Sequence, residues 1–220
     1  MKSLSLVPLL LLSTTAAAQP SAFPPGAFAG VRMQRSSDIE RVLVGPRGEV
    51  FALLLSEGSV IMLPPHLTSE LGLEAGQRVQ VEGDAVQTPL NLVYFRVRLT
   101  RGGQLLITPP LPGKEPRPAG PPPGPPPDEA AGTETTARGA LQAFIATPDG
   151  RVNGLVFSDG TVAVGAPHQS VDVSGLSRGT VLQVSGPRVA EAGALLLERM
   201  TLPDGTVRTL QPLASFGKRE

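Results

Sequence analysis

The 220-residue chain contains no cysteine and no tryptophan, and only one tyrosine and two histidines. The lack of cysteine excludes disulfides, thiolate nucleophiles and thiolate metal ligands. Zinc sites use three or four protein ligands, so two histidines without cysteine fall short of one. We therefore expect stability to come from apolar cores alone, and we predict no metal site and no cofactor.

The chain also lacks an excess of either charge. The full chain has 19 Lys and Arg against 19 Asp and Glu. Residues 1–18, which we predict to be removed, contain Lys2, so the remaining chain has a net charge of −1. Neither half is basic: residues 36–108 hold six arginines against eight acids, and residues 139–211 hold five against six. A neutral protein has no long-range attraction for nucleic acid or anionic lipid, so neither partner is expected.

The first 18 residues have the pattern of a secretory signal peptide. Lys2 is followed by an apolar run over residues 4–12 and by Ala16-Ala17-Ala18. A basic start, a short apolar core and small residues before the cleavage site are typical of such leaders. The run is too short to span a bilayer, although a retained anchor is the alternative. We predict cleavage after Ala18, no membrane span afterwards, and a periplasmic or secreted protein.

The chain contains an internal repeat. SEGSVIMLPPH at residues 56–66 returns as SDGTVAVGAPH at residues 158–168, an offset of 102 that becomes 103 further along. Glycines and prolines stay in step over about 65 residues, which chance would not produce. The sequence therefore predicts two domains, residues 37–107 and 139–211.

Proline-rich sequence lies between the two copies. Eleven prolines fall between Pro109 and Pro127. Proline favours the extended polyproline II helix, so residues 108–138 are predicted to be a semi-rigid spacer that holds the domains apart. The alternative is a ligand for a proline-recognition domain. Residues 19–36 are predicted to be a disordered arm, and residues 212–220 a tail.

Each repeat predicts a small all-β barrel. In the first copy, strands are expected at residues 39–44, 49–56, 59–64, 77–83 and 92–100, with turns rich in glycine and proline between them. A short helix is expected between the third and fourth strands. This is the order of the five-stranded OB barrel, so the predicted fold is two tandem OB-like barrels. In the second copy, a β-bulge near residues 198–199 is expected to restore the register of the last strand.

The leader, the small barrels and the turns of the form S-[DE]-G-[ST]-V resemble the exported bacterial OB-fold proteins. The resemblance covers both repeats and implies a non-catalytic periplasmic binding module. This chain departs from that pattern by having two barrels and a long proline-rich spacer. A role known for one domain therefore does not transfer directly.

The repeated His66 and His168, and the repeated turn glycines Gly58 and Gly160, are interpreted as structural positions. The alternatives for the histidines are a metal ligand or a pH switch. Serine, an acidic residue and histidine recur in each copy, so a hydrolase with a catalytic triad is a further alternative. Ser-[Glu/Asp]-Gly between strands is, however, typical of a hairpin turn, and no G-x-S-x-G elbow accompanies it. We predict no catalytic residue.

The most suggestive polar surface is a stripe of Tyr94, Arg96 and Arg98, with Arg101 just beyond and Arg199 in the comparable region of the second copy. An aromatic side chain between arginines can bind a phosphate, a carboxylate or a sugar. The alternative is a solvated outer face.

The expected function is a non-enzymatic binding module for an envelope protein or glycan, in which two domains on a spacer raise the effective concentration for a repeated target. The alternatives are an OB protein that binds single-stranded nucleic acid and, third, a hydrolase. The first alternative lacks aromatic side chains for stacking, because several of the seven phenylalanines fall in the arm or the predicted core.

Overall fold

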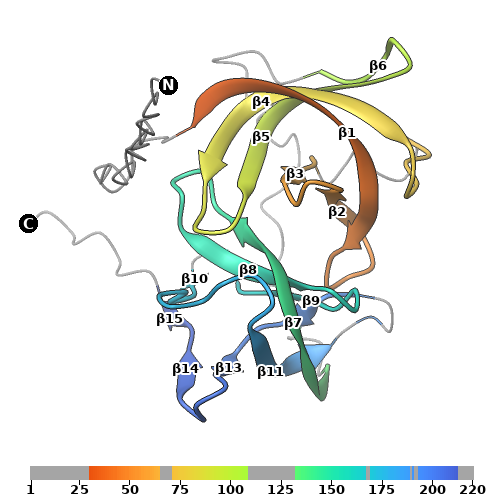
Figure 1. Ribbon diagram of the computed structural model, residues 1–220. Coiled ribbons are helices and arrows are strands. Elements are labelled where there is room, and N and C mark those ends of the chain that lie inside the picture. Colours follow the sequence, from red (N-terminus) through yellow and green to blue (C-terminus); the bar gives the residue numbers. More distant parts are fainter. Residues whose placement is uncertain are drawn as a thin grey trace, which may run out of the picture.

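The structure is a computed structural model that describes residues 30–64, 71–108, 132–166, 169–188, 190 and 193–212. All regular structure in these ranges is β-strand (Figure 1), which confirms the predicted all-β class. No helix in the described ranges is long and apolar enough to cross a membrane. The predicted leader, both histidines, most of the proline-rich segment and the tail beyond residue 212 lie outside the described residues.

The first repeat forms a closed five-stranded barrel. Its strands run in the order β3-β2-β1-β4-β5, and β3 pairs in parallel with β5, which joins the two ends of the sheet. Closure removes the open strand edges that invite aggregation. β6 continues the sheet beyond β5. The strands are β1 (Val31–Val44), β2 (Val50–Leu55), β3 (Val60–Met62), β4 (Arg78–Gln87), β5 (Leu92–Arg101) and β6 (Gln104–Ile107).

The second repeat forms a seven-stranded sheet in the order β12-β9-β8-β7-β11-β13-β14. β12 pairs in parallel with β9 and also antiparallel with β11. β10 and β15 form a separate two-stranded ribbon that includes Pro212, a residue assigned to the tail. The strands are β7 (Thr133–Ala146), β8 (Val152–Phe157), β9 (Val162–Val164), β10 (Gln169–Ser170), β11 (Val181–Arg188), β12 (Leu195–Leu196), β13 (Arg199–Thr201), β14 (Val207–Thr209) and β15 (Gln211–Pro212).

The predicted helix between the third and fourth strands is wrong. The described residues there, 71–77 in the first repeat and 171–180 in the second, form turns and extended chain. Gly76 and Gly179 have φ of 84° and 85°, a left-handed conformation that interrupts a helix. Each donates its N–H to the first strand of its repeat, to Ile39 O at 2.7 Å and Leu141 O at 2.8 Å. The connection is therefore pinned to the barrel in an extended form.

The first strand of each repeat begins earlier than predicted. Residues 31–36, assigned to the disordered arm, belong to β1 and pair with β4. Residues 133–138, assigned to the linker, belong to β7 and pair with β11. Backbone hydrogen bonds hold both segments in their sheets, so these two assignments are wrong. Both sequences are largely polar, so they gave little sign of a strand.

A β-bulge in β5 changes the predicted alternation of its side chains. Arg96 has φ of 46°, and Arg96 and Val97 together oppose Gly83 of β4. An extra residue in one strand shifts the later side chains to the other face. Tyr94 consequently lies inside the barrel, whereas Phe95 points to the outside, where the second repeat covers it.

The last strand of the second repeat also carries one extra residue. β11 advances three residues from Ser185 to Arg188, while the opposite chain advances four, from Arg199 back to Leu195. The added residue lies between β12 and β13, next to the position predicted for the bulge. It allows Leu195 and Met200 to lie in the same apolar cluster.

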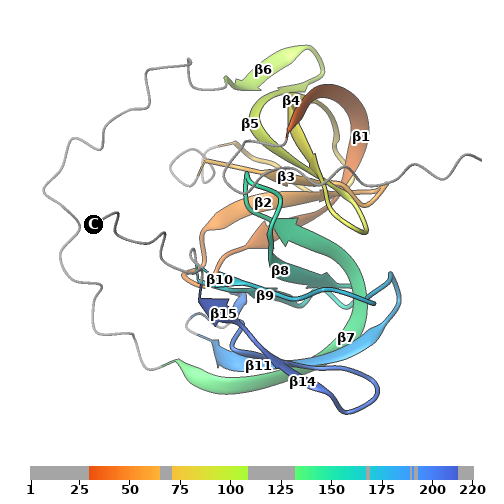
Figure 2. The same cartoon turned by 90° about the vertical axis from the view of Figure 1, so that its left-hand side faces the viewer.

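The two repeats are packed against each other, which overturns the expectation of domains held apart by a spacer. Figures 1 and 2 show strands β1–β6 stacked on strands β7–β15.

Residues 52–55 show how the packing arises. Leu53 and Leu55 point into the first barrel, while Ala52 and Leu54 join an apolar cluster shared with the second repeat. This strand is therefore buried on both faces, as a continuous apolar run indicates. The cluster, here named the shared core, comprises Leu43, Ala52, Leu54, Val60, Val86, Val93, Phe95, Ala143, Ile145, Ala146, Val156, Val162, Val164 and Ala194.

Equivalent positions of the two repeats meet across this interface. Gln142 donates its Nε2–H to Oε1 of Glu40 at 2.6 Å, and the two residues are 102 positions apart, the repeat offset. The shared core likewise contains the equivalent pair Leu54 and Val156. Contact between equivalent residues is the property of a two-fold symmetric interface, so the repeats pack as an internal dimer.

One polar side chain links the repeats within the apolar interface. Asn91, which is 6 % exposed, accepts from the N–H of Phe144 at 2.8 Å and donates to the carbonyl of Phe144 at 3.1 Å. Thr88 holds the amide by donating its hydroxyl to Asn91 Oδ1 at 3.0 Å. Asn91 thus completes the backbone hydrogen bonding of β7, a strand of the other repeat.

We predict that Asn91→Ala destabilises the protein strongly. The substitution leaves the N–H and the carbonyl of Phe144 buried without partners, at roughly 1–3 kcal/mol for each group. Urea unfolding, followed by circular dichroism, measures the loss of stability. Asn153→Ala is the matched control, because Asn153 Oδ1 is buried without a hydrogen-bond partner in the described structure. Equal stability of the two variants would contradict the proposed role of Asn91.

We also predict that Gly83→Ala destabilises the first barrel by about 1–3 kcal/mol, the usual range for overpacking. A Cβ at position 83 would lie 2.7 Å from the carbonyl oxygen of Phe95 and 2.9 Å from Cγ1 of Val97. Thermal unfolding measures the effect. Gln80→Ala, an exposed substitution on the same strand, is expected to stay within about 0.5 kcal/mol of the parent. A Gly83→Ala protein as stable as the parent would show that the bulge tolerates a side chain.

Candidate functional site

The predicted aromatic stripe does not exist as a surface. Tyr94 is fully buried, and its hydroxyl has no hydrogen-bond partner among the described residues. The bulge at Arg96 is the physical reason, because strict alternation does not continue across it: Tyr94 before the bulge and Val97 after it both face the barrel interior. The sequence prediction assumed strict alternation along β5. It could not foresee the bulge, because a non-glycine residue such as Arg96 rarely adopts a positive φ.

The arginines of the stripe have different surroundings. Arg96 pairs with Asp84, with Nε 2.6 Å from Oδ2. Arg101 donates to the carbonyl of Gly72 and to Oε1 of Gln77, both at 2.9 Å, and so holds the connection before β4. Structural contacts therefore account for the placement of both arginines.

Arg199 lies in a different place from the other predicted residues. It belongs to β13 of the second sheet and lies 3.9 Å from Glu134. Its side chain is 57 % exposed. The structure therefore does not bring Arg199 into one site with the arginines of β5.

Arg98 lies in a polar surface on the outside of the first barrel. Cross-strand pairing places it in a row with Glu82 and Gln34, and the next row contains Thr100 and Gln80. The hydroxyl of Thr100 lies 3.4 Å from Oε1 of Gln80. These residues surround a shallow depression of about 210 Å³. We call it the outer polar face; Gln34, Gln80, Val81, Glu82, Arg98 and Thr100 line it.

The repeated hairpin turns lie at the interface between the repeats. Gly58 and Gly160 have φ of 93° and 98°, which an L side chain rarely adopts. Arg41 of β1 reaches the second turn, donating to the carbonyl oxygens of Phe157 at 3.1 Å and Ser158 at 3.3 Å. The turn thus contributes to the contact between repeats.

The serine and acid residues of these turns have different partners in the two copies. In the first copy, Ser37 hydrogen-bonds Ser56 at 3.0 Å and also donates to Glu57. In the second copy, glycine replaces the first serine at position 139, and Asp159 instead accepts from Thr161. His66 and His168 lie outside the described residues, so no contact between serine, acid and histidine is described.

No group of three or more acidic, histidine or cysteine side chains in the described ranges could hold a metal ion. Among the described residues, the carboxyl groups of Asp149, Asp172 and Asp204 have a lowered pKa. Burial raises the pKa of Asp149, but hydrogen bonds and charge from Arg151 and a hydrogen bond from Thr147 outweigh it. Hydrogen bonds from the residue two positions later lower the pKa of Asp172 and Asp204. Asp149 and Asp204 lie in turns and Asp172 lies just before one, so these shifts reflect local turn geometry.

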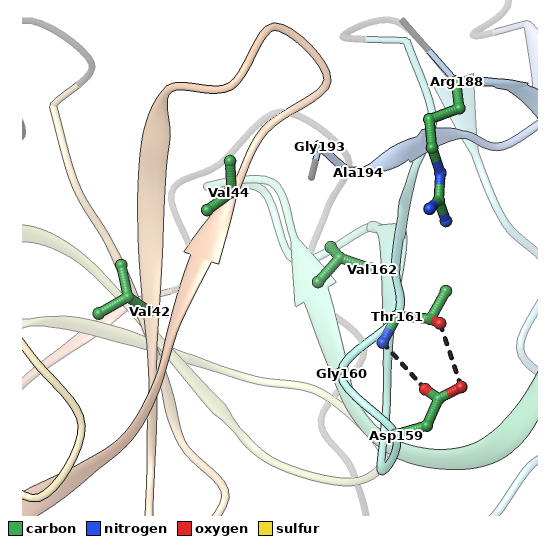
Figure 3. A pocket seen from close by; sticks show the side chains of 9 residues that line it. All are labelled: Val42, Val44, Asp159, Gly160, Thr161, Val162, Arg188, Gly193 and Ala194. Carbon is green, nitrogen blue, oxygen red and sulfur yellow. Dashed lines mark hydrogen bonds between the residues drawn. The ribbon is translucent and has the colours of Figure 1, made fainter. Parts of the chain in front are cut away.

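A second cavity lies at the seam between the repeats (Figure 3), with a volume of about 280 Å³. On one side it is lined by β1, and on the other by the turn between β8 and β9 and by the end of β11. Sequence reasoning missed it, because no local pattern indicates which surfaces of two repeats will meet. We call it the seam cavity; its lining residues are Val42, Val44, Asp159, Gly160, Thr161, Val162, Arg188, Gly193 and Ala194.

The comparisons with known proteins give no relative to guide the interpretation. No protein-family model, no curated protein and no solved structure matches this chain. The assignment of function therefore depends on the chemistry of the outer polar face and the seam cavity.

Proposed function

We propose that both repeats are OB-type barrels. In the first, the closed order β1-β2-β3-β5-β4 with parallel β3 and β5 supports this assignment. In the second, β12 pairs with β9 and with β11, in the positions that β5 takes against β3 and β4. The sequence repeat supports the same assignment for both halves.

We propose that the protein is an exported, non-enzymatic binding module that acts in the periplasm or outside the cell. The leader pattern of residues 1–18 supports export. The partner is an envelope glycan or an envelope protein, bound on the outer polar face. OB barrels bind oligosaccharides on the face of strands 2 and 3 and its flanking loops. Here Ala52, Leu54 and Val60 of that face lie in the shared core, so we place the ligand on the face of β1, β4 and β5 instead.

The composition of the outer polar face carries this proposal. Two amides, a carboxylate, a guanidinium and a hydroxyl from three neighbouring strands surround one depression. Amides both donate and accept hydrogen bonds, which suits the hydroxyl groups of a sugar. Arg98, an exposed residue at the β5 end of the row, adds charge-assisted hydrogen bonds.

The same face disfavours the nucleic-acid alternative. Proteins that bind single strands stack bases on aromatic side chains over a basic groove. Here the only tyrosine of the chain is buried within the first barrel, and Glu82 stands beside Arg98 in the cross-strand row. A glycan or a protein is therefore the better match.

The shared core also changes the expected mode of binding. A flexible tandem gains avidity by letting each domain reach its own target. Repeats joined by a common apolar cluster have a fixed relative orientation instead. We propose that the protein presents one rigid surface, and that binding is measured as a single event per chain.

We predict that Arg98→Ala lowers affinity for the glycan about tenfold or more, the usual effect of losing a hydrogen bond to a charged group. Isothermal titration of the mature protein with soluble fragments of envelope polysaccharide measures the change. Arg199→Ala is the matched control, because that arginine is exposed on the other repeat.

Two results would contradict the proposed function. One is equal loss of affinity in the two arginine variants. The other is retention of the protein on single-stranded DNA at moderate salt without binding to any polysaccharide fragment, which would favour the nucleic-acid alternative.

A further inference from the structure

The seam cavity has a largely polar lining that also includes apolar side chains. Val42 and Val44 line it from the first repeat, and Val162 and Ala194 from the second. Its volume of about 280 Å³ lies near the lower end of small-molecule sites, roughly 300–1,000 Å³. The cavity therefore suits a small molecule with an aliphatic part.

Arg188 supplies a positive charge at this cavity. Its Nε is buried and has no hydrogen-bond partner within the described residues. Figure 3 shows its guanidinium directed along the cavity, toward the turn that carries Thr161. A guanidinium is a strong charged donor, so an anion in the cavity that accepts from its terminal nitrogens would gain charge-assisted hydrogen bonds.

Asp159 supplies the only carboxylate in the described lining of the cavity, and both of its oxygens already accept a hydrogen bond. Asp159 accepts from the N–H of Thr161 at 2.9 Å and from its hydroxyl at 3.1 Å, one bond on each carboxylate oxygen. No ion pair between Asp159 and Arg188 occurs among the described side chains. Arg188 thus has no carboxylate partner among the described residues and can pair with the carboxylate of a ligand.

We propose that the seam cavity binds a small aliphatic carboxylate, with its carboxylate on Arg188 and its alkyl group against the valines. The planar guanidinium pairs with a carboxylate through two parallel hydrogen bonds. The valines favour an alkyl group over a bare inorganic anion. This chemistry is offered both by a free short-chain acid and by the carboxyl terminus of a peptide that ends in an aliphatic residue.

The cavity has walls from both repeats, so its ligand would respond to how they are packed. Val44 accepts a backbone hydrogen bond from Ala194 at 3.1 Å, and this contact crosses the interface beside the cavity. A ligand that touches both walls binds only the packed form and stabilises it. The site is separate from the outer polar face, and its test does not depend on the proposed function.

The experiment uses nuclear magnetic resonance on the mature full chain. Isovalerate is the free acid, isovaleramide is its uncharged analogue, and N-acetylglycylvaline and its amide form the peptide pair. We expect saturable shifts at Val42, Val44, Val162 and Ala194 with an acid and at least tenfold weaker binding of its amide. A response to both acids indicates a general carboxylate site, and a response to one of them identifies the source.

Two variants test the roles of Arg188 and Asp159 in binding the acid. Arg188→Gln is expected to lower the affinity for the acid about tenfold or more, with Arg199→Gln, an exposed arginine of the same repeat, unchanged. Asp159→Asn keeps an oxygen that can accept from Thr161 and removes a nearby negative charge, so affinity should rise about two- to fivefold.

The proposal is overturned if neither acid gives saturable shifts, if acid and amide bind equally, or if the shifts occur elsewhere in the chain. Unchanged affinity in a folded Arg188→Gln protein overturns it as well. If that variant does not fold, the comparison of acid with amide and the Asp159→Asn variant decide the question.

Discussion

The shared core is the interaction on which the rest of this structure depends. Each repeat is small, and a domain of about 70 residues buries too little apolar surface to be very stable alone. Strand residues such as Leu54 and Phe95 lie outside their own barrel and are buried only because the other repeat covers them. The packing of the repeats fixes their orientation, creates the seam cavity and leaves the outer polar face of the first barrel exposed.

The bulge at Arg96 connects the interior of the first barrel with the shared core. Before the bulge, Tyr94 fills the barrel and Phe95 faces the second repeat; after it, Val97 turns back into the barrel. One strand thus supplies both apolar layers and still presents Arg98 to solvent. The tight approach requires glycine at position 83, opposite the bulge.

The strand order β3-β2-β1-β4 of the first repeat returns as β9-β8-β7-β11 in the second, yet equivalent positions have diverged where the repeats meet. Asn91 bonds the backbone of the other repeat with its side chain, while its equivalent Ala194 does so with its backbone N–H alone. Glu40 and Gln142 form one pair from two equivalent positions. These differences break the symmetry of an internal dimer, and the residues that line each of the two cavities are not repeated unchanged in the other half.

The sequence by itself determined the local features: the all-β class, the turns at Gly58 and Gly160, the repeat and the extra residue in the last strand. These follow from short-range rules, because turn conformation and strand pattern depend on neighbouring residues. Only the tertiary structure decided that Tyr94 is buried, that residues 31–36 and 133–138 are strands, and that the repeats share a core. A continuous apolar run such as residues 52–55 indicates burial on both faces, but it does not name the surface that covers the second face. That surface comes from residues about 100 positions away, and packing between distant segments leaves no local pattern in the chain.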